Sequence, residues 1–373
     1  MPLFSLDFYL MTLLITSIAV QLWYYLQVFS RLAEHRPVRS NRDPETSVSI
    51  VICARNEESN LLKNLPLILE QNYPHFEVVV VNDHSSDNTV SILSDFQHTY
   101  ENLKVVTISL SSSENGGKKA ALATGIASTN HEILLLTDAD CSPEGSNWIN
   151  GMVKNFTKGK DLVIGYSPFE KERGMLNAMQ RFDVFYTALQ YLSFALKGIP
   201  YMGVGRNLAY KKALYIENRG FSSHRHILSG DDDLFVSEVA NDQNISVEIS
   251  SDSTTFSPAP ESLTKWFHQK RRHYTTGGNY TFRQKAMLAG FHISLIAFYI
   301  SIVGLLASSG FTALIIALIL LKYSTQFFVL KKCMDKLGEI DLLLLSPILE
   351  LFISVFNFSA ALSNFFLKKP QWN

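Results

Sequence analysis

The sequence predicts an α/β domain with a mostly parallel sheet, carried on transmembrane helices. Two observations lead to this fold class. Apolar, strand-like runs alternate with helical patterns in the middle of the chain, as they do in βαβ units that form parallel sheets. Long, nearly uncharged apolar runs occupy both ends of the chain, and each is long enough to cross a bilayer as a helix. We therefore expect one Rossmann-like domain over residues 47–282, between two membrane regions.

The composition excludes several classes of protein. The 373 residues carry a formal net charge of -1, and 47% of them are hydrophobic. Such a balance creates no global field that favours nucleic acid, so we expect no nucleic-acid partner. The cysteines Cys53, Cys141 and Cys333 are far apart and odd in number. Their spacing predicts neither a disulfide framework nor a zinc site.

A first transmembrane helix is expected within residues 1–30, because residues 8–29 form an apolar run with almost no charge. The run lacks a basic start and a small-residue cleavage site, which indicates a retained anchor. A basic linker over residues 31–46 follows. By the positive-inside rule, it predicts a cytoplasmic catalytic domain on an integral protein of the cell inner membrane or an equivalent membrane. The basic residues of this linker include Arg31, Arg36, Arg39 and Arg42.

Three of the predicted strands end in polar clusters. Residues 48–53, 76–81 and 133–136 are apolar strand-like runs, and residues 105–108 form a further strand. In parallel sheets, ligands bind beyond the carboxyl ends of the strands. The polar residues at the three strand ends are therefore predicted to form one site. They are Arg55 to Glu57, Asp83 to Asp87, and Asp138 with Asp140.

Asp138 and Asp140 flank one small residue at the end of an apolar strand. In an extended chain, residues i and i+2 point to the same face, so both carboxylates can aim at one point. Hard oxygen ligands at that spacing suit Mg²⁺ or Mn²⁺, which would in turn hold a diphosphate. The alternative interpretation is a polar strand exit in which Asp140 caps the following turn.

A glycine-rich segment with Gly116, Gly117 and Lys118 precedes a predicted helix. Glycines let the backbone approach a ligand closely, and a helix N-terminus favours an anion. Lys118 adds a positive charge, although the spacing of a Walker loop is missing. A solvated basic helix start is the alternative.

Taken in order, residues 48–58, 78–89, 117–122 and 137–140 resemble a family-2 glycosyltransferase. The likeness is to the inverting, membrane-anchored branch that includes cellulose-, chitin- and hyaluronan-synthase-like enzymes. The resemblance implies a nucleotide-diphospho-sugar transferase domain, a UDP- or GDP-sugar donor, and a lipid or glycan acceptor. Asn82 stands where the family usually has an acidic residue.

The resemblance also implies the donor-binding residues. Asp83 and the loop after the first strand would hold the base and ribose, and Lys118 would lie near the nucleotide. Asp138 and Asp140 would hold the metal and the diphosphate. The loop residues are Ala54, Arg55, Asn56 and Glu57.

Residues 203–210 resemble the family's Gly-x-Asn-x-Ala-aromatic segment, which lines the sugar pocket. Gly205 would allow close approach, and the amide of Asn207 can both donate and accept hydrogen bonds to sugar hydroxyls. The alternative is an ordinary glycine-rich turn.

Asp231, Asp232 and Asp233 are consecutive carboxylates. Burying all three costs free energy unless a cation or a proton transfer is involved. Inverting glycosyl transfer needs one carboxylate to take the proton from the acceptor hydroxyl. Asp231 or Asp232 is predicted to be this base, with Asp233 in a capping or supporting role. The alternative is an acidic helix start that stabilises the helix dipole.

Residues 262–273 resemble the family's Gln-x-x-Arg-Trp segment, with Gln269, Arg272 and, in place of the tryptophan, His273. Arg272 would neutralise charge on the leaving diphosphate. Trp266 could offer a stacking surface. The histidine weakens the case for processive synthesis, which is associated with tryptophan in the family. A basic amphipathic helix at a membrane interface is the alternative.

A C-terminal transmembrane region of two or three helices is expected over residues 283–373. Its apolar runs cover residues 287–307, 311–330 and 342–367, and a short turn at 308–310 separates the first two. Basic residues after the second run again predict the cytoplasmic side. The third run is counted as a fourth span, with a kink or a re-entrant path left open by its polar residues. The basic residues after the second run are Lys331, Lys332 and Lys336. The third run contains Pro347, Glu350 and Asn357 and is followed by Lys368 and Lys369.

Together these features predict a membrane-bound, metal-dependent, inverting hexosyltransferase. It would transfer a sugar from a nucleotide-diphosphate sugar to a hydroxyl of a lipid-linked or polysaccharide acceptor. A processive polysaccharide synthase is the alternative within this chemistry. A catalytically inactive membrane scaffold that binds sugar nucleotide is a second class. A nucleotidyltransferase is a third, but its glycine-rich, Arg- and Lys-containing loop is not seen in residues 53–60.

Overall fold

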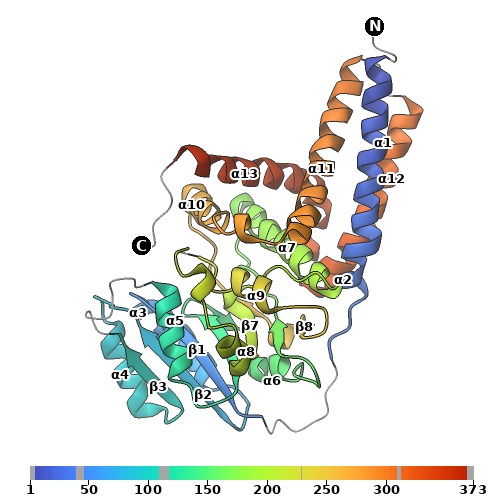
Figure 1. The fold of residues 1–373 in the computed structure, drawn as a ribbon. Helices are drawn as coiled ribbons and strands as arrows, with labels where there is room; N and C mark the ends of the chain where they lie inside the picture. Colours follow the sequence, from blue (N-terminus) through green and yellow to red (C-terminus); the bar gives the residue numbers. More distant parts are fainter. Residues whose placement is uncertain (1–4, 39–45, 109–116, 228, 309–311, 368–373) are drawn as a thin grey trace.

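The computed structural model describes residues 5–38, 46–108, 117–227, 229–308 and 312–367. Several features named above lie outside the described residues: Arg39, Arg42, Gly116, the turn residues 309–310, Lys368 and Lys369. Figure 1 shows a sheet domain, formed by the described residues between 46 and 281, from which long helices project.

A seven-stranded sheet with the order β3-β2-β1-β4-β7-β6-β8 organises the sheet domain. Strands β3, β2, β1 and β4 are parallel to their neighbours. Strand β7 runs antiparallel to β4 and β6, and β8 is parallel to β6. This mostly parallel, mixed sheet confirms the predicted fold class. The strands are β1 (Val48–Ala54), β2 (Phe76–Asn82), β3 (Leu103–Thr107), β4 (Ile133–Asp138), β6 (Leu162–Ile164), β7 (Leu208–Lys211) and β8 (Ile245–Val247), with a separate pair β5 (Ser142–Pro143) and β9 (Thr255–Phe256).

Helices cover both faces of the sheet, so its central strands are apolar on both sides. Alternate side chains of β1 enter different cores, as the two-residue period of a strand requires. Ile50 and Ile52 pack with the helices of one face, and Val51 packs with those of the other. The first face carries α3 (Glu58–Leu69), α4 (Thr89–Thr99) and α6 (Trp148–Val153), and the second carries α5 (Lys118–Ala127) and α7 (Met175–Leu196).

The parallel register brings the polar strand ends to one edge of the sheet. Ala54 of β1 is paired with Asn82 of β2, and Cys53 is paired with Asp138 of β4. The segments that follow these three strands therefore begin side by side. Three further helices complete the domain: α8 (Lys212–Glu217), α9 (Asp233–Val239) and α10 (Leu263–His273).

Three long helices form a bundle that projects from the sheet domain (Figure 1). Helix α1 (Leu6–Tyr24) continues through a π-helical turn, η1 (Tyr25–Phe29), into α2 (Ser30–Glu34). It lies against α11 (Phe282–Ser308) and α12 (Ala313–Lys336). A short 3-10 segment, η7 (Ile340–Leu345), leads into α13 (Ser346–Phe366). Four helical segments in the described chain are long and apolar enough to cross a membrane: Leu6–Glu34, Phe282–Ser308, Ala313–Lys336 and Ile340–Phe366.

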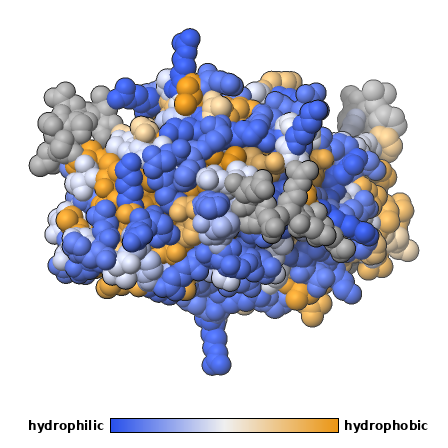
Figure 2. Space-filling view, turned by 90° about the horizontal axis from the view of Figure 1, so that it is seen from below, coloured by the Kyte–Doolittle hydropathy of each residue, from blue (hydrophilic) through white to orange (hydrophobic). Residues whose placement is uncertain are grey.

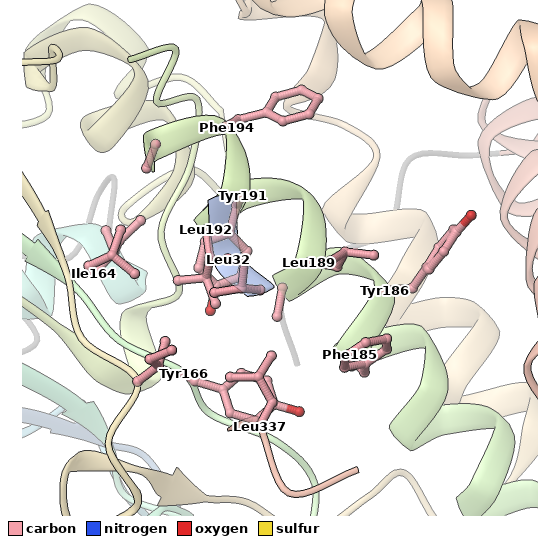
Figure 3. Close-up of a cluster of buried hydrophobic side chains, with 14 of the residues drawn as sticks. Leu32, Ile164, Tyr166, Phe185, Tyr186, Leu189, Tyr191, Leu192, Phe194 and Leu337 are labelled. Atoms are coloured by element: carbon pink, nitrogen blue, oxygen red, sulfur yellow. The ribbon is translucent and has the colours of Figure 1, made fainter. Parts of the chain in front are cut away.

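Helix α7 connects the sheet domain to the bundle, and the sequence analysis did not predict it. Its side chains pack with Leu32 of α2, with Ile164 of β6 and with Leu337 after α12 (Figure 3). The face of the sheet domain shown in Figure 2 is instead mostly hydrophilic. The long helices and the sheet domain therefore share one continuous core on the side of α7.

Candidate active site

Lys118 joins the two acidic parts of the predicted site. Its ammonium lies 2.7 Å from Oδ1 of Asp138 and 3.5 Å from Oδ2 of Asp231. Lys118 is the first residue of α5, and Gly117 before it has a φ of 135°, a conformation that only glycine adopts without strain. The start of α5 thus delivers a positive charge to the point where the end of β4 meets the acidic segment before α9.

This contact lies in a small pocket at the carboxyl edge of the sheet. The pocket is lined by Val51, Cys53, Lys118, Leu122, Leu136, Thr137, Asp138, Gly205, Asp231 and Asp232. Five of these residues are among the predicted site residues: Lys118, Asp138, Gly205, Asp231 and Asp232.

Asp138 and Asp140 converge as their spacing predicts. Their carboxylate oxygens and the sulfur of Cys141 lie within 4.8 Å of one another. Burial alone would raise the pKa of Asp138, but the charge and hydrogen bond of Lys118, together with the charges of Arg206 and Arg272, outweigh it and hold that pKa below its ordinary value. Burial, together with the charge of Asp138, raises the pKa of Asp140. Two hard carboxylates that repel each other in this way fit Mg²⁺ or Mn²⁺ as ligands. The Cys141 thiol is too soft a ligand for either ion.

The loops after β1 and β2 are bound to each other. Ser85 accepts a hydrogen bond from the backbone N–H of Asn56 (3.0 Å), and the side-chain oxygen of Asn56 accepts one from the backbone of Ser86 (2.8 Å). Asn56 and His84 both have a φ of 56°, a strained region that is often occupied at functional sites. His84 Nδ1 lies 2.8 Å from Oδ1 of the buried Asp83. These loops form a preorganised rim around Asp83.

The predicted rim residues differ in exposure. Arg55 and Asn56 are exposed, Glu57 is half-buried, and Ala54 is buried at the end of β1. The side chain of Glu57 accepts a hydrogen bond from Asn60 (2.6 Å), so it also supports the start of α3.

The three consecutive aspartates have different partners. Asp231 faces Lys118. Asp232 accepts hydrogen bonds from the backbone N–H of Gly205 (2.8 Å) and of Asp233 (2.7 Å). Burial, followed by the charges of Asp231 and Asp233, raises the pKa of Asp232 to about 7. Asp233 accepts hydrogen bonds from Thr276 and from the hydroxyl of Tyr280 (2.9 Å).

Asn207 does not line a sugar pocket, contrary to the expectation from the sequence. Its side chain is fully buried. Its oxygen accepts a hydrogen bond from Trp148 Nε1 (3.0 Å), and its nitrogen donates to the carbonyls of Tyr166 and Ser253 (2.8 Å each). Both amide hydrogens are used, so Asn207 holds three segments together behind the site.

The neighbour of Asn207, Arg206, belongs to the site and was missed in the sequence analysis. It donates to the carbonyl of Ser167 (3.0 Å) and lies over the ring of Phe169 at 5.3 Å. Its positive charge lowers the pKa of both Asp138 and Asp140. The sequence did contain a signal, because Arg206 lies within the glycine-rich segment 203–210. The orientation of its side chain, however, depends on residues far away in the chain.

Helix α10 brings only part of its predicted residues to the site. Arg272 is half-buried and close enough to Asp138 for its charge to lower the pKa of that carboxyl. Gln269 is half-buried and His273 is exposed. Trp266 is fully buried and stacks on Phe356 of α13, with 4.1 Å between the ring centroids. The suggestion that Trp266 offers a stacking surface to a ligand is therefore wrong.

The sheet order, with a carboxylate pair at the end of β4, defines a nucleotide-diphospho-sugar transferase fold of the GT-A type. Residues 49–217 match the model of a family described as Glycosyl transferase family 2. In a comparison with solved structures, the mannosyltransferase PcManGT from Pyrobaculum calidifontis in complex with GDP-Man and Mn²⁺ matches with a TM-score of 0.62 and 18% identity. The match covers 98% of this chain and 100% of that chain, and it shows a common fold.

Two curated relatives illustrate the sequence similarity. The probable glycosyltransferase YdaM of Bacillus subtilis is 26% identical over 257 residues, which are 65% of this chain and 57% of YdaM. Glycosyltransferase AglE of Haloferax volcanii is 36% identical over 141 residues, which are 37% of this chain and 44% of AglE. The chain thus spans about half the length of these relatives.

Proposed function

We propose that the protein is a membrane-bound, inverting glycosyltransferase that transfers a hexosyl unit from a nucleotide-diphosphate sugar to a hydroxyl. One observation carries the proposal: the ammonium of Lys118 contacts both Asp138 and Asp231. The residues proposed for the leaving diphosphate and those proposed for the acceptor therefore lie on either side of one side chain. A sugar bound between them would have its anomeric carbon within reach of both groups.

Asp232 is the proposed general base. It lies on the pocket wall, and a carboxylate whose pKa is about 7 can accept a proton near neutral pH. In the transfer step, Asp232 takes the proton of the acceptor hydroxyl. The hydroxyl oxygen bonds to the anomeric carbon as the bond to the diphosphate oxygen breaks, and the electron pair leaves with the diphosphate. A single displacement of this kind inverts the configuration.

The leaving diphosphate is proposed to bind near Asp138, Asp140 and three cationic side chains. Asp138 and Asp140 would hold Mg²⁺ or Mn²⁺, which supplies positive charge to the departing diphosphate. Lys118, Arg206 and Arg272 add positive charge around the same point, as their effects on Asp138 indicate. The loop with Asn56 and the side chain of Asp83 are proposed to hold the ribose and base.

The site is proposed to lie in the cytoplasm, close to the membrane. Arg31 and Arg36 follow α1, and Lys331, Lys332 and Lys336 end α12. Lys336 donates a hydrogen bond to the carbonyl of His35, so both basic segments lie at the same end of the bundle. Positive charge at one end favours the cytoplasmic side. An acceptor carried by a lipid, or a glycan made at the membrane, would then be near the site.

The first test is nucleotide release by the full-length protein in native-lipid membranes. UDP- and GDP-hexoses are supplied with Mg²⁺, with Mn²⁺, or with a chelator. We expect release from one donor class that requires metal and falls at least about a hundredfold in Asp140→Ala, the scale of one lost charge interaction in the transition state. Asp95→Ala, which removes an exposed carboxylate from α4, is the matched control and keeps full activity.

Two results would contradict the proposal. Metal-independent release that persists in Asp140→Ala would show that Asp138 and Asp140 are not a metal site. Binding of a donor without turnover, in the presence of extracted membrane lipids as acceptors, would instead favour an inactive scaffold.

A further inference from the structure

We propose that α13 lies flat in the interfacial layer of the bilayer, on the side of the sheet domain, and does not cross the membrane. Its length and composition allow a span, and the sequence analysis counted it as one. Its contacts and its depth relative to α1 favour a different position. The partner of its exposed face is then the boundary between lipid headgroups and acyl chains.

One face of α13 is a continuous apolar stripe. Its exposed side chains follow one another at intervals of three or four residues, which places them on one side of a helix. They are Ile348, Leu351, Val355, Phe358, Leu362 and Phe365. Exposed apolar side chains in such an unbroken row are unusual for a surface in contact with water. The stripe therefore requires a nonpolar environment along the whole helix.

The opposite face of α13 is bound to charged elements of the sheet domain. Asn357 donates to Asp183 of α7 (3.1 Å), which also accepts from Lys270 of α10 (3.0 Å). Asn364 donates to the carbonyl of Arg271 (2.9 Å). Trp266 of α10 also stacks on Phe356, the residue before Asn357. Helix α13 is thus fastened to α7 and α10 along its C-terminal half.

The depth of α13 follows from its contact with α1. The 19 residues of α1 extend over about 28 Å, close to the thickness of the hydrocarbon core. Tyr25, the next residue, donates to Glu350 of α13 (3.1 Å). The start of α13 therefore lies beside the end of α1 that adjoins the sheet domain. Trp23 and Tyr24 precede this point, as aromatic residues commonly do at an interface.

A membrane-spanning α13 would bring charged residues into the hydrocarbon. From Glu350, the helix would have to rise about 21 Å to reach Asn364, at 1.5 Å per residue. Arg271 would rise with it because Asn364 is bound to its carbonyl, and Lys270 would follow as its neighbour on α10. Charged side chains at that depth are strongly disfavoured. Figure 1 shows α13 extending to one side of the bundle, roughly at right angles to α11 and above α10 and α7; a helix in this orientation keeps these charges on the side of the sheet domain.

Labelling of single cysteines from each side of sealed membranes tests the topology. Leu367→Cys, just after α13, is compared with Lys158→Cys on the sheet domain and with Ser308→Cys at the far end of α11. An impermeant maleimide should label Leu367→Cys from the same side as Lys158→Cys, with Ser308→Cys reacting only from the other side. The parent protein gives the background of its three cysteines. Labelling of Leu367→Cys from the side of Ser308→Cys would overturn the proposal.

Spin-label depth measurements give a second, independent test. Nitroxides at Ile348→Cys, Val355→Cys and Leu362→Cys lie on one face, two turns apart, in vesicles of phosphatidylethanolamine and phosphatidylglycerol. An interfacial helix predicts the same shallow depth at all three positions. A spanning helix predicts the deepest label at position 355 and shallower labels on either side, which would disprove the interfacial position.

Discussion

Asp231, Asp232 and Asp233 show how three identical neighbouring residues acquire different roles. Lys118 faces the first, backbone N–H groups hold the second, and Thr276 with Tyr280 binds the third. The carboxylate of Asp233 is therefore committed to linking α9 with the segment before α11. Asp232 is left as the carboxylate with the pKa best suited to a general base.

The pH dependence of turnover tests this assignment. With the pKa of Asp232 near 7, kcat/KM should fall about tenfold per unit as the pH decreases below 7, because only the ionised base accepts a proton. Asp232→Asn should lower kcat/KM by at least about a hundredfold above pH 7 and should remove the acidic limb. Asp231→Asn removes a negative charge that raises the pKa of Asp232, so it should shift the acidic limb to lower pH. Steady-state rates from pH 5 to pH 9 measure both effects.

The opposite pattern would assign the base to Asp231. In that case Asp231→Asn would lose the acidic limb together with the activity, and Asp232→Asn would keep both. The sequence could predict the acidic cluster but not its division of roles. Gly205, Thr276 and Tyr280 are distant in the chain, and only the fold brings them to these aspartates.

At the scale of elements, the strands that carry the site could be predicted because polar residues come directly after each apolar run. The predicted runs at 48–53, 76–81 and 133–136 correspond to β1, β2 and β4 within two residues. Helix α7 was not predicted, although it has 22 residues. It is buried on most of its surface, so its apolar residues do not form the single stripe by which an amphipathic helix is found.

The position of α5 depends on a close approach at Gly125. A Cβ atom there would lie 2.7 Å from Cγ1 of Val51 and 2.8 Å from Cγ2 of Val81. Gly125→Val should therefore lower the free energy of unfolding by about 1–3 kcal/mol through overpacking. It should also raise KM for the donor, because Lys118 stands at the other end of the same helix. Thermal unfolding in detergent and donor titrations measure the two effects.

A control on the same helix separates packing from helix propensity. Ala127 is exposed, so Ala127→Val should cost no more than about 0.7 kcal/mol and leave KM unchanged. Equal effects of the two substitutions would mean that contact of Gly125 with the sheet does not position Lys118.

For the whole molecule, the predicted boundary between membrane helices and sheet domain is sharper than the boundary in the structure. Their common core contains Leu32, Leu337 and much of α7 (Figure 3). Hydropathy reports the environment of each segment by itself, and it cannot show that α2 and the end of α12 pack on α7. For the same reason it could not distinguish a spanning α13 from one held flat by α10.

A buried ion pair at the junction of these parts gives the last prediction. Lys322 of α12 lies 2.9 Å from Glu350 of α13, and both side chains are fully buried. Glu350 also accepts hydrogen bonds from Tyr25 and from Tyr186 of α7 (2.7 Å). One carboxylate thus connects α7, α12, α13 and the end of α1. Removing only its charged partner leaves a buried, uncompensated charge, which typically costs about 3–5 kcal/mol.

Lys322→Met should therefore lower the unfolding temperature in detergent strongly, whereas Lys332→Met, on the exposed side of the same helix, should change it little. The double variant Lys322→Met with Glu350→Gln should recover much of the loss, because no unpaired charge remains. If the losses in unfolding temperature caused by Lys322→Met alone and by Glu350→Gln alone simply add in the double variant, Lys322 and Glu350 act independently. The junction would then be held by its apolar core, and the ion pair would not be what fixes α13 to the bundle.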